Sequence, residues 1–181
     1  MPKKIAVLVG SLRKESVNRK IAKELMRLSS DGLDLEIVEI GNLPLYNEDL
    51  DANPPQEWTD FRAKIKAADG ILVVSPEYNR TIPGALKNAV DVGSRPYGES
   101  VWPGKPGGVV TSSPSGIGGA VANHHLRQAF VFVDVPIMQQ PEDYLGGAWN
   151  FWKEDGVTVV EKTEEVLQKF IDAYEKWVNK F

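Results

Sequence analysis

Short apolar runs alternate with helical stretches five times along this chain, and this alternation limits the possible folds more than any other feature. The expected strands cover residues 5–9, 33–40, 71–75, 105–112 and 135–138, and the expected helices cover 17–28, 57–68, 83–92, 120–132 and a last stretch from about 163. The alternation is typical of an α/β protein with a doubly wound parallel sheet and helices on both faces. A length of 181 residues fits one domain, so we expect a single domain over residues 1–181.

Three polar loops follow the first, third and fourth expected strands. They cover residues 11–18, 76–79 and 112–119. In a five-stranded sheet of order 2-1-3-4-5, these loops open at the same edge, beside the point where the winding reverses. Ligands of open α/β sheets bind at that edge, so we expect the three loops to form one site.

The first loop has the composition of an anion site. It follows a buried strand and Gly10 and leads into a helix, so backbone N–H groups and the positive end of a helix dipole point at one place. Ser11, Ser16 and Asn18 add neutral donors, and Arg13 adds a charged one. The spacing matches neither the dinucleotide fingerprint nor the P-loop. Taken alone, the loop fits an anion site and an ordinary helix-capping loop equally well.

Composition excludes several classes of function. The chain has no cysteine, so disulfides and thiolate chemistry are excluded, and its two histidines, His124 and His125, are too few to suggest a metal site. The net charge of −4 argues against a nucleic-acid or anionic-membrane surface. No apolar run approaches the length of about 20 residues that a membrane span needs. The first strand follows Met1 almost at once, which leaves no room for a signal peptide, so we expect a cytoplasmic protein.

The loop residues themselves carry a resemblance. The motifs are Gly10-Ser11-Leu12-Arg13-x-x-Ser16-x-Asn18, then Pro76-Glu77-Tyr78-Asn79 with Pro83-Gly84-x-Leu86-Lys87-Asn88, then Ser113-x-x-Gly116-x-Gly118-Gly119. To about residue 145 the chain resembles the NADPH-dependent FMN reductase family, in the branch that includes quinone and chromate reductases. It departs from the family pattern at Val92 and Val121, where tryptophan and arginine are frequent.

The resemblance implies a flavodoxin-like fold, bound FMN, NADPH or NADH as co-substrate, and a homodimer or homotetramer. We expect the backbone amides with Ser11, Arg13, Ser16 and Asn18 to bind the FMN phosphate. The ring-binding residues are expected to be Pro76, Glu77, Tyr78, Asn79, Ser113, Ser115 and Gly116. Pro76 and Tyr78 would lie against the ring, and the others would reach its edge through backbone groups. Arg80 is the candidate contact for the phosphates of NAD(P)H.

The flavin carries the hydride chemistry, so no catalytic acid, base or nucleophile is expected from the protein. We expect a ping-pong oxidoreductase that passes electrons to soluble acceptors such as quinones, flavins, azo or nitro compounds, or chromate. Two alternatives stay open: a flavodoxin-type electron carrier without substantial NAD(P)H turnover, and a non-enzymatic module that binds a phosphate ligand. Trp149, Phe151 and Trp152 form an aromatic group that we assign to packing or a subunit contact rather than to a ligand.

Overall fold

The computed structural model describes all 181 residues and contains one five-stranded parallel sheet, as predicted. The strand order is β2-β1-β3-β4-β5. The strands are β1 (Lys3–Val9), β2 (Leu33–Ile37), β3 (Gly70–Pro76), β4 (Gly107–Ser113) and β5 (Asp143–Gly146). β1, β3 and β4 form the middle of the sheet and are almost wholly buried, because helices cover them on both sides.

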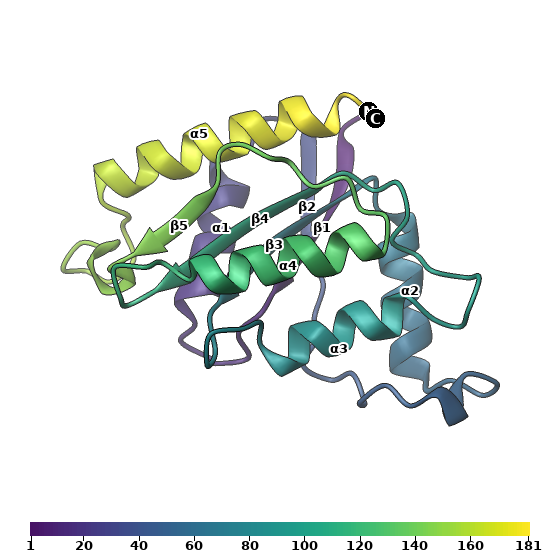
Figure 1. Cartoon of the computed structure of the whole chain (residues 1–181). Coiled ribbons are helices and arrows are strands. Elements are labelled where there is room, and N and C mark those ends of the chain that lie inside the picture. The colour runs from purple at the N-terminus through teal and green to yellow at the C-terminus, as the bar shows by residue number, and fades with distance from the viewer.

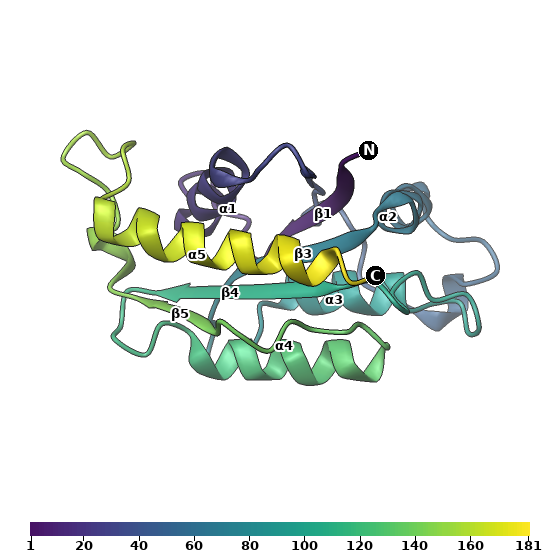
Figure 2. The same ribbon diagram turned by 90° about the horizontal axis from the view of Figure 1, so that it is seen from above.

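Five α-helices and two 3₁₀ turns connect and cover the strands. The helices are α1 (Val17–Leu28), α2 (Gln56–Ala67), α3 (Gly84–Gly93), α4 (Ala120–Phe132) and α5 (Glu161–Val178), and the turns are η1 (Glu48–Leu50) and η2 (Ala148–Asn150). α1 and α5 pack on one face of the sheet, and α2, α3 and α4 pack on the other (Figures 1 and 2). The expected doubly wound arrangement is therefore confirmed, and each face has its own apolar core.

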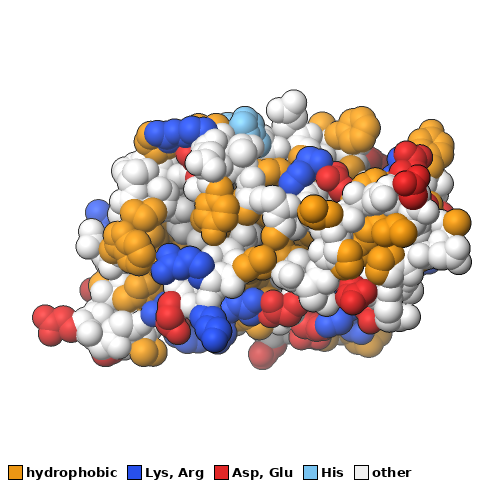
Figure 3. Space-filling model, turned by 90° about the horizontal axis from the view of Figure 1, so that it is seen from below, with side chains coloured by type: hydrophobic (Ala, Val, Ile, Leu, Met, Phe, Trp, Pro, Cys, Tyr) orange, Lys and Arg blue, Asp and Glu red, His pale blue; other side chains and the backbone are white.

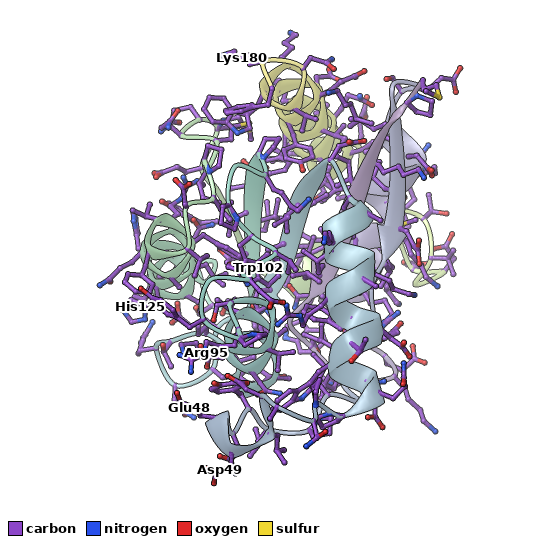
Figure 4. All side chains as sticks on the ribbon, turned by 90° about the vertical axis from the view of Figure 1, so that its right-hand side faces the viewer. Glu48, Asp49, Arg95, Trp102, His125 and Lys180 are labelled. Atoms are coloured by element: carbon purple, nitrogen blue, oxygen red, sulfur yellow. The ribbon has the colours of Figure 1, made fainter.

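Trp102 organises the core under α2, α3 and α4. Its indole is completely buried, donates its N–H to the Val90 carbonyl at 2.9 Å, and meets Phe61 and Phe130 edge to face. Figure 4 shows Arg95 between this core and η1. Arg95 Nη2 lies 2.7 Å from a Glu48 carboxylate oxygen, which ties the long connection between β2 and α2 to the end of α3.

The expected fifth strand at residues 135–138 is wrong. Its residues Val135–Met138 run beside the start of β4, with hydrogen bonds from Gly107 N to the Pro136 carbonyl at 3.0 Å and from Met138 N to the Gly107 carbonyl at 2.8 Å. Only an isolated bridge forms there, because Pro136 has no N–H to continue a ladder. The edge strand is Asp143–Gly146, which pairs with the last four residues of β4. Because the composition of this strand is mixed, a search of the sequence for apolar runs does not detect it.

The register of the sheet brings the three predicted loops together. Val9 pairs with Val74, and Pro76 pairs with Ser112, so β1, β3 and β4 end at one edge. The loops after these strands lead into α1, α3 and α4. None of the helices has both the length and the apolar character of a membrane span.

Asp143 gives the fold a testable pH dependence. Its side chain is 8% exposed, one carboxylate oxygen has no hydrogen-bond partner, and burial raises its pKa to about 6. Because the folded pKa lies above the unfolded value, ionisation of Asp143 destabilises the fold as the pH rises through about 4 to 6. We expect Asp143→Asn to raise the free energy of unfolding at pH 7.5 by about 1–3 kcal/mol.

Urea unfolding of both proteins between pH 4 and pH 8 checks this expectation. The gain from Asp143→Asn should shrink toward zero at the acidic end, where Asp143 is neutral. A gain that is the same at both ends, or a loss at pH 7.5, would contradict the burial argument.

Candidate functional site

A cleft of about 220 Å³ opens where the loops after β1, β3 and β4 meet. Its lining residues are Ser11, Arg13, Ser16, Val17, Asn18, Pro76, Glu77, Tyr78, Ser112, Ser113, Pro114, Ala148 and Trp149. The site is mostly polar and uncharged, with one arginine and one carboxylate. Figure 3 views the molecule from below Figure 1, a face on which hydrophobic, basic and acidic side chains are interspersed with other side chains and backbone.

The loop after β1 presents unpaired backbone donors. No backbone N–H group from Ser11 to Asn18 donates a hydrogen bond within the protein. Ser11, Ser16 and Asn18 are nonetheless buried, and buried N–H groups need an acceptor. The start of α1 adds the positive end of its dipole at the same place. An anion in the cleft would satisfy these donors.

Two side chains of this loop are held by the fold. The Ser16 hydroxyl caps α1 by accepting from the Arg19 N–H at 3.2 Å. The Asn18 side-chain oxygen accepts from the Ser112 hydroxyl at 2.9 Å, inside the protein. The second bond joins the first turn of α1 to the end of β4, and so fixes two walls of the cleft against each other.

Arg13 is the free cation of the site. The chain has seven arginines, and Arg13 is the one with no carboxylate oxygen within 4.0 Å. It also lines a second cleft of about 380 Å³ with Gly10, Leu12, Tyr78, Pro83, Gly84 and Ala85. Arg13 and Tyr78 therefore stand at the junction of two adjoining spaces, one toward α1 and one toward α3.

The loop after β3 is a tight turn held at its base. Asn79 and Arg80 both have positive φ values, of 50° and 61°, and Tyr78 and Thr81 exchange two hydrogen bonds of 3.0 Å. Non-glycine residues at positive φ are strained, so the surrounding structure must hold the turn. Glu77 does so: one carboxylate oxygen accepts from the Ala122 N–H at 3.1 Å, and the other accepts from Arg80 at 3.1 Å. Its side chain thus positions the loop.

The loop after β4 packs against β5. The Ser113 hydroxyl lies 3.0 Å from that of Ser115, and its oxygen accepts from the Ser115 N–H at 3.1 Å. Gly118 has a φ of 65°, and a Cβ at this position would overlap the backbone carbonyl of Tyr144. Only glycine accommodates both the positive φ and the close contact with the Tyr144 backbone, so the loop can pack directly against β5.

The structure brings together eight of the twelve residues that the sequence proposed for the site. Ser11, Arg13, Ser16, Asn18, Pro76, Glu77, Tyr78 and Ser113 line the cleft. Asn79, Arg80, Ser115 and Gly116 belong to the same loops but are exposed outside its lining. Five further residues line the cleft and were not predicted for the site, namely Val17, Ser112, Pro114, Ala148 and Trp149.

Three of the missed residues were detectable because they adjoin the motifs. Val17, Ser112 and Pro114 are direct neighbours of predicted residues. Ala148 and Trp149 follow β5, and the misplaced fifth strand left them without a position at the sheet edge.

His124 and His125 are exposed on α4, where they contact Tyr144 and Thr81. No group of three His, Cys, Asp or Glu side chains is placed to hold a metal ion.

A parallel sheet of order 2-1-3-4-5, with a donor-rich loop at the start of α1, defines a flavodoxin-like protein. The family model for NADPH-dependent FMN reductases matches residues 3–150. A quinone reductase of Pseudomonas putida is 56% identical over 175 residues, which cover 96% of this chain and 94% of that protein. A 2-hydroxy-1,4-benzoquinone reductase of a Burkholderia species is 45% identical over 178 residues, which cover 98% of this chain and 97% of that protein.

A solved structure agrees with these sequences. FerB of Paracoccus denitrificans, a flavoenzyme NAD(P)H:(acceptor) oxidoreductase, superposes with a TM-score of 0.91 at 41% identity and covers 98% of both chains. The chain belongs to the NADPH-dependent FMN reductase family. The resemblance carried by the three loop motifs is thereby confirmed over nearly the whole length.

The glycines of the loop after β4 provide a stability test with an internal control. Gly118→Ala places a methyl group against the Tyr144 backbone and forces alanine to a positive φ, so we expect a loss of about 2 kcal/mol or more in unfolding free energy. Gly116→Ala meets no atom within 4 Å and should change stability by less than about 0.5 kcal/mol. Thermal unfolding of the two variants measures the difference, and equal midpoints would refute the packing argument.

Proposed function

We propose that this chain is an FMN-dependent NAD(P)H oxidoreductase that reduces quinones. The observation that carries the proposal is the cleft itself. It is lined by Arg13, which is free of any carboxylate, and by Ser11, Ser16, Val17 and Asn18, whose N–H groups, like that of Arg13, donate no hydrogen bond within the protein. This donor set fits a phosphate dianion. The family supports FMN as the cofactor, and the named quinone reductases support quinones as acceptors.

Residues of the first loop would bind the FMN phosphate. The amides of residues 11–18, the Ser11 and Ser16 hydroxyls and the Arg13 guanidinium supply the donors, with no metal needed. The Asn18 side chain keeps the start of α1 against β4 through its bond with Ser112. When bound, FMN supplies the chemistry of accepting a hydride from NAD(P)H and passing the electrons to an acceptor.

The other two loops would bind the ring. Pro76 and Tyr78 offer flat apolar surfaces, and the backbone groups of Glu77, Asn79 and Ser113–Gly116 offer donors and acceptors for its polar edge. Glu77 contributes by holding the strained turn through Ala122 and Arg80. This prior positioning reduces the ordering cost when the cofactor binds.

The second cleft is our candidate for the place where NAD(P)H and the quinone bind in turn. It adjoins the first at Arg13 and Tyr78, and Leu12, Pro83 and Ala85 give it an apolar wall suited to a flat ring. One space that serves two substrates in succession predicts ping-pong kinetics. Arg80 lies in the turn that follows Tyr78, and its exposed guanidinium is paired only to Glu77, so it is our candidate contact for a nucleotide phosphate.

Several finer expectations stay predictions. Flavins, azo and nitro compounds and chromate remain candidate acceptors beside quinones, and the cytoplasm remains the expected location. A homodimer or homotetramer stays a prediction from the family resemblance. The relatives named as quinone reductases count against the flavodoxin-type electron carrier as the alternative function.

Anaerobic spectroscopy of the purified protein tests the proposal. We expect the apoprotein to take up FMN, NADPH or NADH to bleach the flavin absorbance, and a quinone such as 1,4-benzoquinone to restore it. Protein that takes up no FMN would refute the proposal. Bound flavin that NAD(P)H fails to bleach, although dithionite does, would favour the electron carrier.

Removal of Arg13 tests the phosphate site. We expect Arg13→Ala to weaken FMN binding by about 1.5–3 kcal/mol, the scale of a charge-assisted hydrogen bond. Arg27→Ala is the matched control, because Arg27 lies at the other end of α1 and is paired with Glu24 and Glu164. Calorimetric titration with FMN should show the loss only for the Arg13 variant. Unchanged affinity would remove Arg13 from the phosphate site.

A further inference from the structure

The aromatic group at 149–152 divides in the structure into two packing residues and one cleft residue. Phe151 is buried in the core beneath α1 and α5, and Trp152 packs against the same core. Trp149 lines the cleft instead, and 61% of its surface is exposed. An exposed indole at the mouth of a cleft that contains a phosphate-binding loop has a position suited to covering a ligand. Trp149 therefore differs from Phe151 and Trp152, because it lines the cleft instead of packing in the core.

The backbone before Trp149 is fixed to the loop after β4. Gly147 N donates to the Ser115 carbonyl at 3.3 Å, and a Cβ at Gly146 would lie 2.7 Å from the Gly116 carbonyl oxygen. These contacts leave no free space between the edge strand and residues 115–116. Ala148, next to Trp149, is fully buried. The indole therefore extends from an anchored turn rather than from a loose loop.

The backbone after Trp149 is fixed to α1. Residues 151–160 form a short antiparallel hairpin, with hydrogen bonds from Val160 N to the Phe151 carbonyl at 2.9 Å and from Lys153 N to the Thr158 carbonyl at 2.7 Å. Lys20 of α1 donates to the Gly156 carbonyl at 2.9 Å and lies 5.6 Å from the Trp152 ring centroid. Figures 1 and 2 show this segment projecting beyond α5, on the side where α1 lies.

The chain is thus attached on both sides of Trp149. Gly147 bonds to the loop after β4, and Gly156 bonds to Lys20 of α1, the helix that begins at the phosphate-binding loop. Trp149 shares the cleft with Ser16, Val17 and Pro114, and it does not line the second cleft beside α3. Trp149 accordingly belongs to the cleft that contains the phosphate-binding loop and not to the space that we assign to the substrates.

We propose that Trp149 covers the ribityl-phosphate part of FMN and retains the cofactor during turnover. The proposal rests on the proposed function, because it takes FMN as the occupant of the cleft. Its consequence is a protein that keeps FMN as a resident group while nicotinamide and quinone exchange in the second cleft. An aromatic cover slows release of the flavin without blocking the opposite side of the site.

The rate of FMN release from the holoprotein tests this role. We expect Trp149→Ala to release FMN at least about tenfold faster than the wild type, because loss of a large aromatic contact weakens binding by about a factor of ten or more. Trp149→Phe keeps a ring and should stay within about threefold of the wild type. The measurement is the rise in free-FMN fluorescence after the holoprotein is diluted so far that released FMN does not rebind.

Val157→Ala is the matched control. Val157 is exposed in the same hairpin but does not line the cleft. The Val157→Ala protein should therefore release FMN at the wild-type rate. A Trp149→Ala protein that releases FMN at the wild-type rate would overturn the role of Trp149 while leaving the proposed function intact. A wild-type protein that binds no FMN would refute the proposed function itself.

Discussion

Parallel pairing of β1, β3 and β4 is the interaction on which the site depends. Because all three strands run in one direction and end in register, the loops that follow them must leave the sheet at the same edge. Helices on both faces keep these strands buried and leave no freedom to slip, since a shift of one residue would turn apolar side chains away from the two cores. The cleft is thus a consequence of sheet topology, and the loops supply only its chemistry.

Side chains and tight backbone contacts then fix the loops relative to one another. Asn18 joins α1 to β4 through Ser112, Glu77 joins the loop after β3 to the start of α4, and Gly147 joins η2 to the loop after β4. Each bond contributes about 1 kcal/mol, yet together they hold three chain segments around one space. In contrast, Arg13 and the amides of residues 11–18 have no partners within the protein. The fold therefore gives hydrogen-bond partners to the groups that hold the walls of the cleft. It leaves Arg13 and the amides that would bind an anion without partners.

The sequence predicts the middle of the sheet better than its edge. Apolar runs located β1, β3 and β4, and the helices at 17–28 and 120–132 agree with α1 and α4. β5 was misplaced because Asp143, Tyr144 and Gly146 give an edge strand no apolar pattern, while the apolar residues Val135–Met138 only bridge to Gly107. Ala148 and Trp149 were missed as cleft residues for the same reason: their place depends on tertiary pairing, which no local pattern records.

The central claim is that the first loop is built to bind a phosphate, and the comparison of FMN with riboflavin tests it most directly. The two ligands share the ring and the ribityl chain and differ in the phosphate alone. Isothermal titration of the apoprotein should give an affinity for FMN at least about 100-fold higher than that for riboflavin, because several charge-assisted hydrogen bonds are lost with the phosphate. Equal affinities for the two flavins would contradict the account.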